Sequence, residues 1–187
     1  MITIVSGLPR SGTSLLMQMI HAGGIPALTD ALRTPDEDNP RGYLEFEAVK
    51  RTKQDPSWLN QADGKVVKMV HLLLYDLPAD RSYRVVFIRR NLKEVLASQR
   101  KMLQRQGKPG AAIPDEQLAK VFEDQLSKLF AWLNGQPHIA WLEVAYNDLL
   151  NDAPPVVARI NQFLGGGLDE GRMLSAIDPG LYRNRAG

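Results

Sequence analysis

The stretch ITIVSGLPRSGTS (residues 2–14) decides the fold of this chain. Its first part, Ile2–Ser6, is apolar and β-branched, which predicts a buried strand, and a helix is expected from about Thr13 to Ala22. Between them, successive backbone N–H groups and the helix N-terminus point into one hollow and favour an anion. The sequence therefore predicts a phosphate-binding loop over Gly7–Ser14, with an unliganded glycine turn as the alternative.

The loop resembles that of nucleoside triphosphatases, in which glycine, four residues and glycine precede a lysine and a serine or threonine. Gly7 and Gly12 fit this spacing, and Ser14 occupies the hydroxyl position. However, Thr13 stands where the lysine would be, and the cation of the loop is Arg10, at its crown. A magnesium-dependent hydrolase or kinase acting on ATP or GTP would normally keep the lysine, so that function is the less favoured alternative.

Strands and helices alternate along the rest of the chain. Three more strands are expected at Lys65–Val70, Arg84–Ile88 and Ile139–Val144; helices are expected from Asn91 onward, over Gln117–Leu133 and from Pro154 to Leu164. This alternation predicts an α/β fold, a three-layer sandwich whose central sheet is mainly parallel and covered on both faces. A length of 187 residues suits a single domain, 1–187.

The composition argues against several classes of partner. The formal net charge of +2 creates no strong field toward nucleic acid or an anionic membrane, so neither is an expected partner. The chain has no cysteine, and its three histidines are well separated in sequence, so no metal site is expected. No apolar stretch is long enough to span a bilayer and the chain starts without a basic leader, so the expected location is the cytoplasm.

A second motif, RRNLKEVLAS (residues 89–98), follows the strand expected at Arg84–Ile88. Arg90 and Ser98 lie about two helical turns apart, so both can face the same side of a helix. Arg90 also lies at the carboxyl end of a strand, where open α/β sheets bind ligands. Taken alone, the motif is more typical of a helix-start arginine in a surface ion pair, with a solvated serine, than of a binding site.

Together, PRSGTS after one strand and RRNLKEVLAS after another resemble the cofactor signature of the sulfotransferases. The segments DNPRGYLE (residues 38–45) and VAYNDLLNDAPPVVARINQFLG (residues 144–165) are similar to further parts of that family. The resemblance implies a P-loop NTPase-like fold. It also implies transfer of a sulfuryl group from PAPS (3′-phosphoadenosine 5′-phosphosulfate) to a small hydroxyl or amine acceptor, with PAP as the product.

The resemblance also implies which residues hold PAPS. Arg90 and Ser98 would bind the 3′-phosphate, and the 5′-phosphosulfate would lie against the loop residues Pro9, Arg10, Ser11, Gly12, Thr13 and Ser14. The arginine-lysine-glycine segment that closes over the nucleotide in cytosolic members of the family has no exact match here. Arg183, in the segment LYRNR (residues 181–185), is a possible substitute, and a frayed basic tail is the alternative. The chain is short for the family, so a nucleotide-binding protein without turnover stays open.

Sulfuryl transfer needs a base for the acceptor's proton and a cation near the leaving phosphate. His71, which follows a lysine near a strand end, resembles the family's base, although the spacing from Lys68 is one residue longer. Glu45 is an equal candidate, because several relatives use glutamate; Asp36 and Glu37 are weaker ones. Lys68 is the candidate cation, and a strand-edge surface lysine is the alternative.

Overall fold

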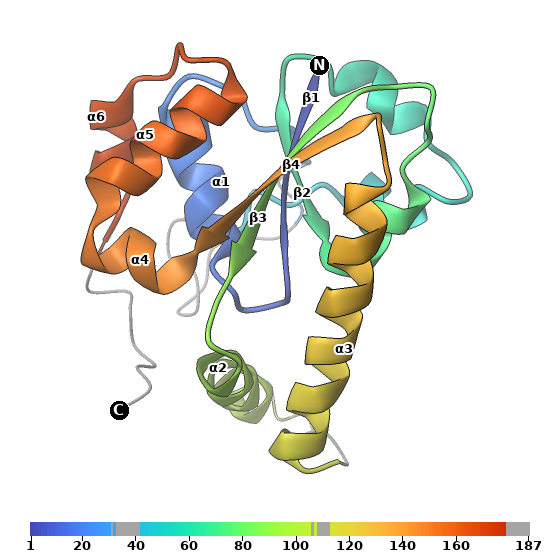
Figure 1. Cartoon of the computed structure of the whole chain (residues 1–187), viewed down its shortest axis with the longest axis vertical. Helices are drawn as coiled ribbons and strands as arrows, with labels where there is room; N and C mark the ends of the chain where they lie inside the picture. Colours follow the sequence, from blue (N-terminus) through green and yellow to red (C-terminus); the bar gives the residue numbers. More distant parts are fainter. Residues whose placement is uncertain (31, 33–41, 106, 108–112, 179–187) are drawn as a thin grey trace.

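The computed structural model of the chain describes residues 1–30, 32, 42–105, 107 and 113–178 (Figure 1). The described part contains four strands, which are all parallel and lie in the order β2-β1-β3-β4. They are β1 (Ile2–Gly7), β2 (Val66–Val70), β3 (Tyr83–Arg89) and β4 (Ile139–Ala145). The predicted α/β class with a parallel central sheet is therefore confirmed, and each strand lies within one residue of its expected ends.

Six α-helices and three short 3₁₀ helices occur in the described ranges. The α-helices are α1 (Thr13–Ala22), α2 (Leu92–Arg105), α3 (Asp115–Asn134), α4 (Tyr146–Asn151), α5 (Ala153–Leu164) and α6 (Glu170–Ser175); the 3₁₀ helices are η1 (Glu47–Arg51), η2 (Ser57–Gln61) and η3 (His71–Asp76). The sequence did not predict α4 and α6, which are too short to display a helical period. None of the described helices is both long and apolar enough to cross a membrane.

The sheet separates two hydrophobic cores, which makes three layers. Side chains alternate between the faces along each strand. In β3, Val85 and Phe87 pack with α3 and the 3₁₀ helices, whereas Val86 and Ile88 pack with α1, α4, α5 and α6. Figure 1 shows the same division, with α1 and α4–α6 together on one side of the sheet and α3 on the other.

The ligand-binding edge of the sheet follows from its strand order. The connection from β1 leads to β2 on one side of it, whereas the connection from β3 leads to β4 on the other side. These connections diverge between β1 and β3, and this is where open parallel sheets bind ligands. Gly7, the last residue of β1, is in register with Val70 of β2 and Ile88 of β3. The two sequence motifs therefore leave neighbouring strands at the same edge.

Helix α2 starts as the sequence predicts. The side chain of Asn91 accepts a hydrogen bond from the backbone N–H of Lys93 at 2.9 Å, as an N-cap residue does. Val95, Leu96 and Ser98 are buried. Glu94 is also buried, and its carboxylate binds Arg90. The start of α2 thus lies just after the carboxyl end of β3, and both residues of the second motif are buried there.

Candidate nucleotide and sulfuryl-transfer site

The loop between β1 and α1 is a tight turn in which two residues have positive φ angles. The backbone N–H of Ser11 donates to the carbonyl of Leu8 at 3.1 Å and closes the turn. Arg10 has φ 70° and Gly12, the N-cap of α1, has φ 104°. A left-handed conformation is uncommon for arginine and adds local strain. This backbone turns the chain from β1 into α1 within the few residues that a phosphate loop needs.

Neighbouring side chains leave no room for a side chain at the two loop glycines. A Cβ on Gly7 would lie 2.5 Å from the Ser11 hydroxyl, and one on Gly12 would lie 2.4 Å from the ring of Tyr146. The Ser11 hydroxyl is itself buried and has no hydrogen-bond partner in the described part of the chain. Both glycines are therefore required by packing, and Gly12 also by its backbone conformation.

We expect Gly12→Ala to be costly for two separable reasons. The positive φ angle contributes about 1–3 kcal/mol of destabilisation, and the overlap with Tyr146 adds about 1–3 kcal/mol of overpacking. Gly24→Ala is the matched control, because Gly24 has φ 122° but nothing within 4 Å of the added Cβ. Urea unfolding should show the larger loss for Gly12→Ala; equal losses would contradict the contact with Tyr146.

The two motifs are joined by hydrogen bonds between their side chains and backbone. Nε of Arg10 donates to the Ser98 hydroxyl at 3.0 Å. From the other direction, Nη1 of Arg90 donates to the backbone carbonyl of Arg10 at 3.4 Å. The Arg10 side chain thus extends from the crown of the phosphate loop to the serine of the second motif.

A buried ion pair fixes Arg90. Its Nε lies 2.8 Å from a carboxylate oxygen of Glu94, and the two side chains are only 7% and 2% exposed. The guanidinium also lies over the ring of Tyr146, 4.6 Å from its centre, and Asn147 donates to Glu94 at 3.4 Å. Burial raises the pKa of Tyr146, and the positive charge of Arg90 partly opposes this rise. Arg90 is therefore held from several sides at the carboxyl end of β3.

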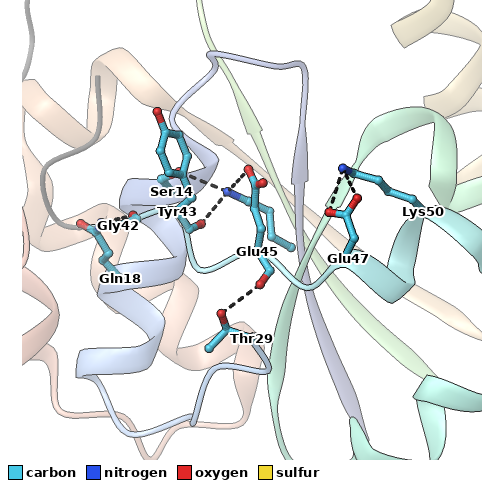
Figure 2. A network of polar contacts seen from close by, with 9 residues as sticks. Ser14, Gln18, Thr29, Gly42, Tyr43, Glu45, Glu47 and Lys50 are labelled. Atoms are coloured by element: carbon cyan, nitrogen blue, oxygen red, sulfur yellow. Dashed lines mark hydrogen bonds and ion pairs between the residues drawn. The ribbon is translucent and has the colours of Figure 1, made fainter. Parts of the chain in front are cut away.

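A second polar cluster surrounds the amine of Lys68 (Figure 2). Lys68 Nζ lies 3.1 Å from a carboxylate oxygen of Glu45, and donates to the Tyr43 carbonyl at 2.6 Å and to the Ser14 hydroxyl at 3.3 Å. The lysine side chain is 10% exposed and that of Glu45 28%. Lys68 is therefore not a strand-edge surface lysine, which was the alternative considered from the sequence. Its amine joins β2 to the phosphate loop and to the segment that carries Glu45.

The Glu45 segment, residues 42–45, has a backbone that is held at both ends by hydrogen bonds. The Glu45 carbonyl accepts from the Thr29 hydroxyl at 2.9 Å and from the Asp30 N–H at 3.3 Å, and Gln18 donates to the Gly42 carbonyl at 3.1 Å. Figure 2 shows Thr29 and Gln18 approaching the segment from either end. Leu44, with φ 48°, turns the chain between these anchors. Glu45 is thus presented from a defined backbone.

His71 lies in a different environment. It is the first residue of η3, is only 3% exposed, and its Nε2 lies 3.0 Å from the side-chain oxygen of Gln125 in α3. Its Nδ1 is buried with no hydrogen-bond partner among the described residues. Burial lowers the pKa of His71 below its ordinary value, and the bond to Gln125 acts in the opposite direction. The imidazole therefore joins the start of η3 to α3.

A pH dependence of stability follows from this burial. The unfolded chain binds a proton at His71 near pH 6.5, whereas the folded protein binds it only at lower pH, so acidification favours unfolding. We expect the free energy of unfolding to fall as the pH drops below about 6.5. His71→Gln, which keeps a donor toward Gln125, should reduce that fall; urea titrations at several pH values measure it, and an unchanged slope would contradict the burial.

One cavity of about 800 Å³ connects the two clusters. Its described lining includes six basic and three acidic side chains: Arg10, Lys50, Lys68, Arg90, Lys101 and Arg105, and Glu45, Glu47 and Asp178. Small-molecule sites are typically of about this size, and an excess of basic groups suits an anionic ligand. His71 is not among the residues that line the cavity.

Most of the residues that the sequence assigned to the site meet at this cavity. The residues that line it are Arg90, Ser98, Glu45, Lys68 and the loop residues Pro9, Arg10, Gly12, Thr13 and Ser14. Ser11 is buried within the loop and is not among the lining residues. Arg183, Asp36 and Glu37 lie outside the described residues, and their assignments stay predictions.

The structure adds residues that sequence reasoning missed. Tyr146, the first residue after β4, lines the cavity. Its position at the carboxyl end of a strand could have marked it as a ligand-binding residue in the sequence. Tyr43, Lys101 and Arg105 also line the cavity. Lys101 and Arg105 follow Ser98 at helical spacing, a signal that the sequence shares with any basic surface helix.

Comparisons with known proteins agree with this arrangement. The profile of the sulfotransferase domain matches residues 2–179, which is nearly the whole chain. No curated protein matches.

Solved structures give the same fold. The sulfotransferase domain of the olefin synthase from Synechococcus PCC 7002 is 17% identical, with a TM-score of 0.56 over 97% of this chain and 85% of that domain. The sulfotransferase domain from the curacin biosynthetic pathway is 14% identical, with a TM-score of 0.55 over 95% of this chain and 77% of that domain.

Retinol dehydratase, solved with androsterone and the inactive cofactor PAP, is 18% identical, with a TM-score of 0.54; 97% of this chain aligns with 64% of that protein. At these identities the likeness establishes the fold, and the P-loop NTPase-like form of the α/β class is confirmed. The extent of the profile match settles the family: the chain belongs to the sulfotransferases.

Proposed function

We propose that residues 1–187 form a single sulfotransferase domain that moves a sulfuryl group from PAPS to a small hydroxyl or amine acceptor. The observation that carries the proposal is the bond between the two motifs. Arg10 donates to Ser98 and Arg90 donates to the Arg10 carbonyl, in the same cavity as Glu45 and Lys68. One ligand can therefore touch the phosphate loop, the second motif and a carboxylate together.

The nucleotide end of the cavity, where the phosphate loop meets Arg90 and Ser98, suits a ligand with two separate phosphate groups. The N-terminus of α1 and the loop residues around Gly12 favour one anion, in the place proposed for the 5′-phosphosulfate. Arg90 and Ser98 offer donors for a second, the 3′-phosphate. PAP bound to retinol dehydratase, a protein of the same fold, supports this choice of nucleotide.

The environment of Ser14 favours PAPS over a magnesium–triphosphate complex. In nucleoside triphosphatases the hydroxyl at this position binds Mg²⁺. Here the hydroxyl accepts a hydrogen bond from the ammonium group of Lys68, at 3.3 Å. The protein itself therefore supplies the positive charge beside Ser14, which is compatible with a less highly charged group than a triphosphate terminus.

Glu45 is the base that this geometry supports best. It lines the cavity, whereas His71 lies outside the lining and is bonded to Gln125. PAPS, when bound, supplies the sulfuryl group. Glu45 would accept the proton of the acceptor hydroxyl or amine, and Lys68, whose Nζ is 3.1 Å from that carboxylate, would stabilise negative charge developing on the leaving 5′-phosphate. The fixed backbone of the Glu45 segment limits the reorganisation that these steps require.

Release of PAP from PAPS tests the function directly. The protein is incubated with PAPS and, in turn, small alcohols, phenols and amines, and PAP is quantified with and without each acceptor. We expect acceptor-dependent release that does not require magnesium. Magnesium-dependent cleavage of ATP or GTP, with PAPS left intact by every acceptor, would instead favour the triphosphatase alternative.

A further inference from the structure

A stripe of side chains on α2 continues the nucleotide end of the cavity beyond the second motif. Lys101, Met102 and Arg105 follow Ser98 by three, four and seven residues. This spacing places the four side chains on one face of a helix. All four line the cavity. Lys93, on the same helix, is not among the lining residues. The stripe is therefore directed at the ligand space rather than distributed around the helix.

Two arginines lie near Ser98, and one of them already has its charge balanced. Arg10 donates to the Ser98 hydroxyl at 3.0 Å. Arg90 is paired with the buried carboxylate of Glu94 at 2.8 Å, so together these side chains contribute little net charge. A phosphate monoester carries a charge of about −1.5 to −2 at neutral pH. Binding such a group beside Ser98 favours further cations nearby. Lys101 and Arg105 follow Ser98 by about 4.5 Å and 10.5 Å along the helix axis.

We propose that Lys101 and Arg105 form a second cationic pair for the 3′-phosphate side of the nucleotide, an inference that rests on the proposed function. Because both side chains are exposed, their attraction for phosphate is screened by salt more strongly than that of buried Arg90.

The test compares nucleotides that differ only in the 3′-phosphate. PAP and 5′-AMP are titrated calorimetrically into the unmodified protein, into Lys101→Gln/Arg105→Gln, and into Lys93→Gln/Lys120→Gln. The last variant removes the same charge from exposed positions outside the cavity lining. Titrations at about 0.1 M and about 1 M salt compare screening lengths of roughly 10 Å and 3 Å.

At the lower salt concentration we expect Lys101→Gln/Arg105→Gln to weaken PAP binding roughly tenfold and 5′-AMP binding far less. The defect should shrink at the higher concentration, and the control variant should bind both nucleotides as the unmodified protein does. Unchanged PAP affinity, or equal losses for PAP and 5′-AMP, would overturn the assignment. If the unmodified protein bound PAP no better than 5′-AMP, the proposed function itself would fail.

Discussion

Glu45→Gln is expected to lower kcat by about 10²–10⁴-fold, the usual contribution of a general base. The amide keeps the shape of the side chain but cannot accept the proton of the acceptor. Affinity for PAP should be nearly unchanged, because the base acts on the acceptor and not on the nucleotide. PAP release under saturating PAPS, with an acceptor that supports turnover, measures the rate, and calorimetry measures the affinity.

His71→Asn is the matched control for this prediction. His71 does not line the cavity and contacts Gln125 of α3, so its replacement should affect stability more than kcat. The opposite pattern, with Glu45→Gln at full rate and His71→Asn inactive, would show that the imidazole reaches the acceptor. That result would exclude Glu45 as the base.

Arg90→Met is expected to cost about 3–5 kcal/mol of stability, because it removes the cation that is paired with the buried Glu94 carboxylate. Glu94 is 2% exposed at its side chain, and Asn147 donates to it only at 3.4 Å. The variant should also lose the preference for PAP over 5′-AMP. Urea unfolding measures the first effect and calorimetry the second.

The double variant Arg90→Met/Glu94→Gln separates these two effects. It removes both charges and leaves an amide oxygen toward Asn147, so most of the lost stability should return. The preference for PAP should not return, since the guanidinium is still absent. A loss below about 1 kcal/mol in Arg90→Met alone would indicate a solvated pair, contrary to the burial of both side chains.

The sheet and the phosphate loop could be predicted because they depend on local sequence signals. The β-branched run Ile2–Ser6 and the spacing of Gly7 and Gly12 specify a strand, a turn and a helix start within a few residues. The N-cap Asn91 likewise marks the start of α2. By contrast, α4 has six residues, too few to show a period, and was missed.

The choice of base could not be made from the sequence, because it depends on contacts between distant segments. Glu45 and Lys68 are 23 residues apart and meet only where β2 passes the segment after Gly42. His71 and Gln125 are 54 apart, and their contact depends on how α3 packs on the sheet. No pattern of residue types distinguishes a carboxylate that lines a cavity from one on a surface loop.

Tyr146 shows the same limit for the nucleotide site. Its ring covers Gly12 and lies against Arg90, so three segments far apart in sequence share one contact. A tyrosine after a strand is usually a packing residue. Only the register of β3 with β4 brings it to the phosphate loop.

Calorimetric titration of the unmodified protein with PAP and with 5′-AMP tests the central claim most directly. The claim is that one cavity binds a nucleotide through its 5′ and 3′ phosphate groups at once. PAP should bind at least about tenfold more tightly than 5′-AMP, since charge-assisted hydrogen bonds to the 3′-phosphate each contribute about 1.5–3 kcal/mol. The difference should persist without magnesium. Equal affinities for the two nucleotides, or binding of ATP with magnesium in preference to PAP, would contradict the claim.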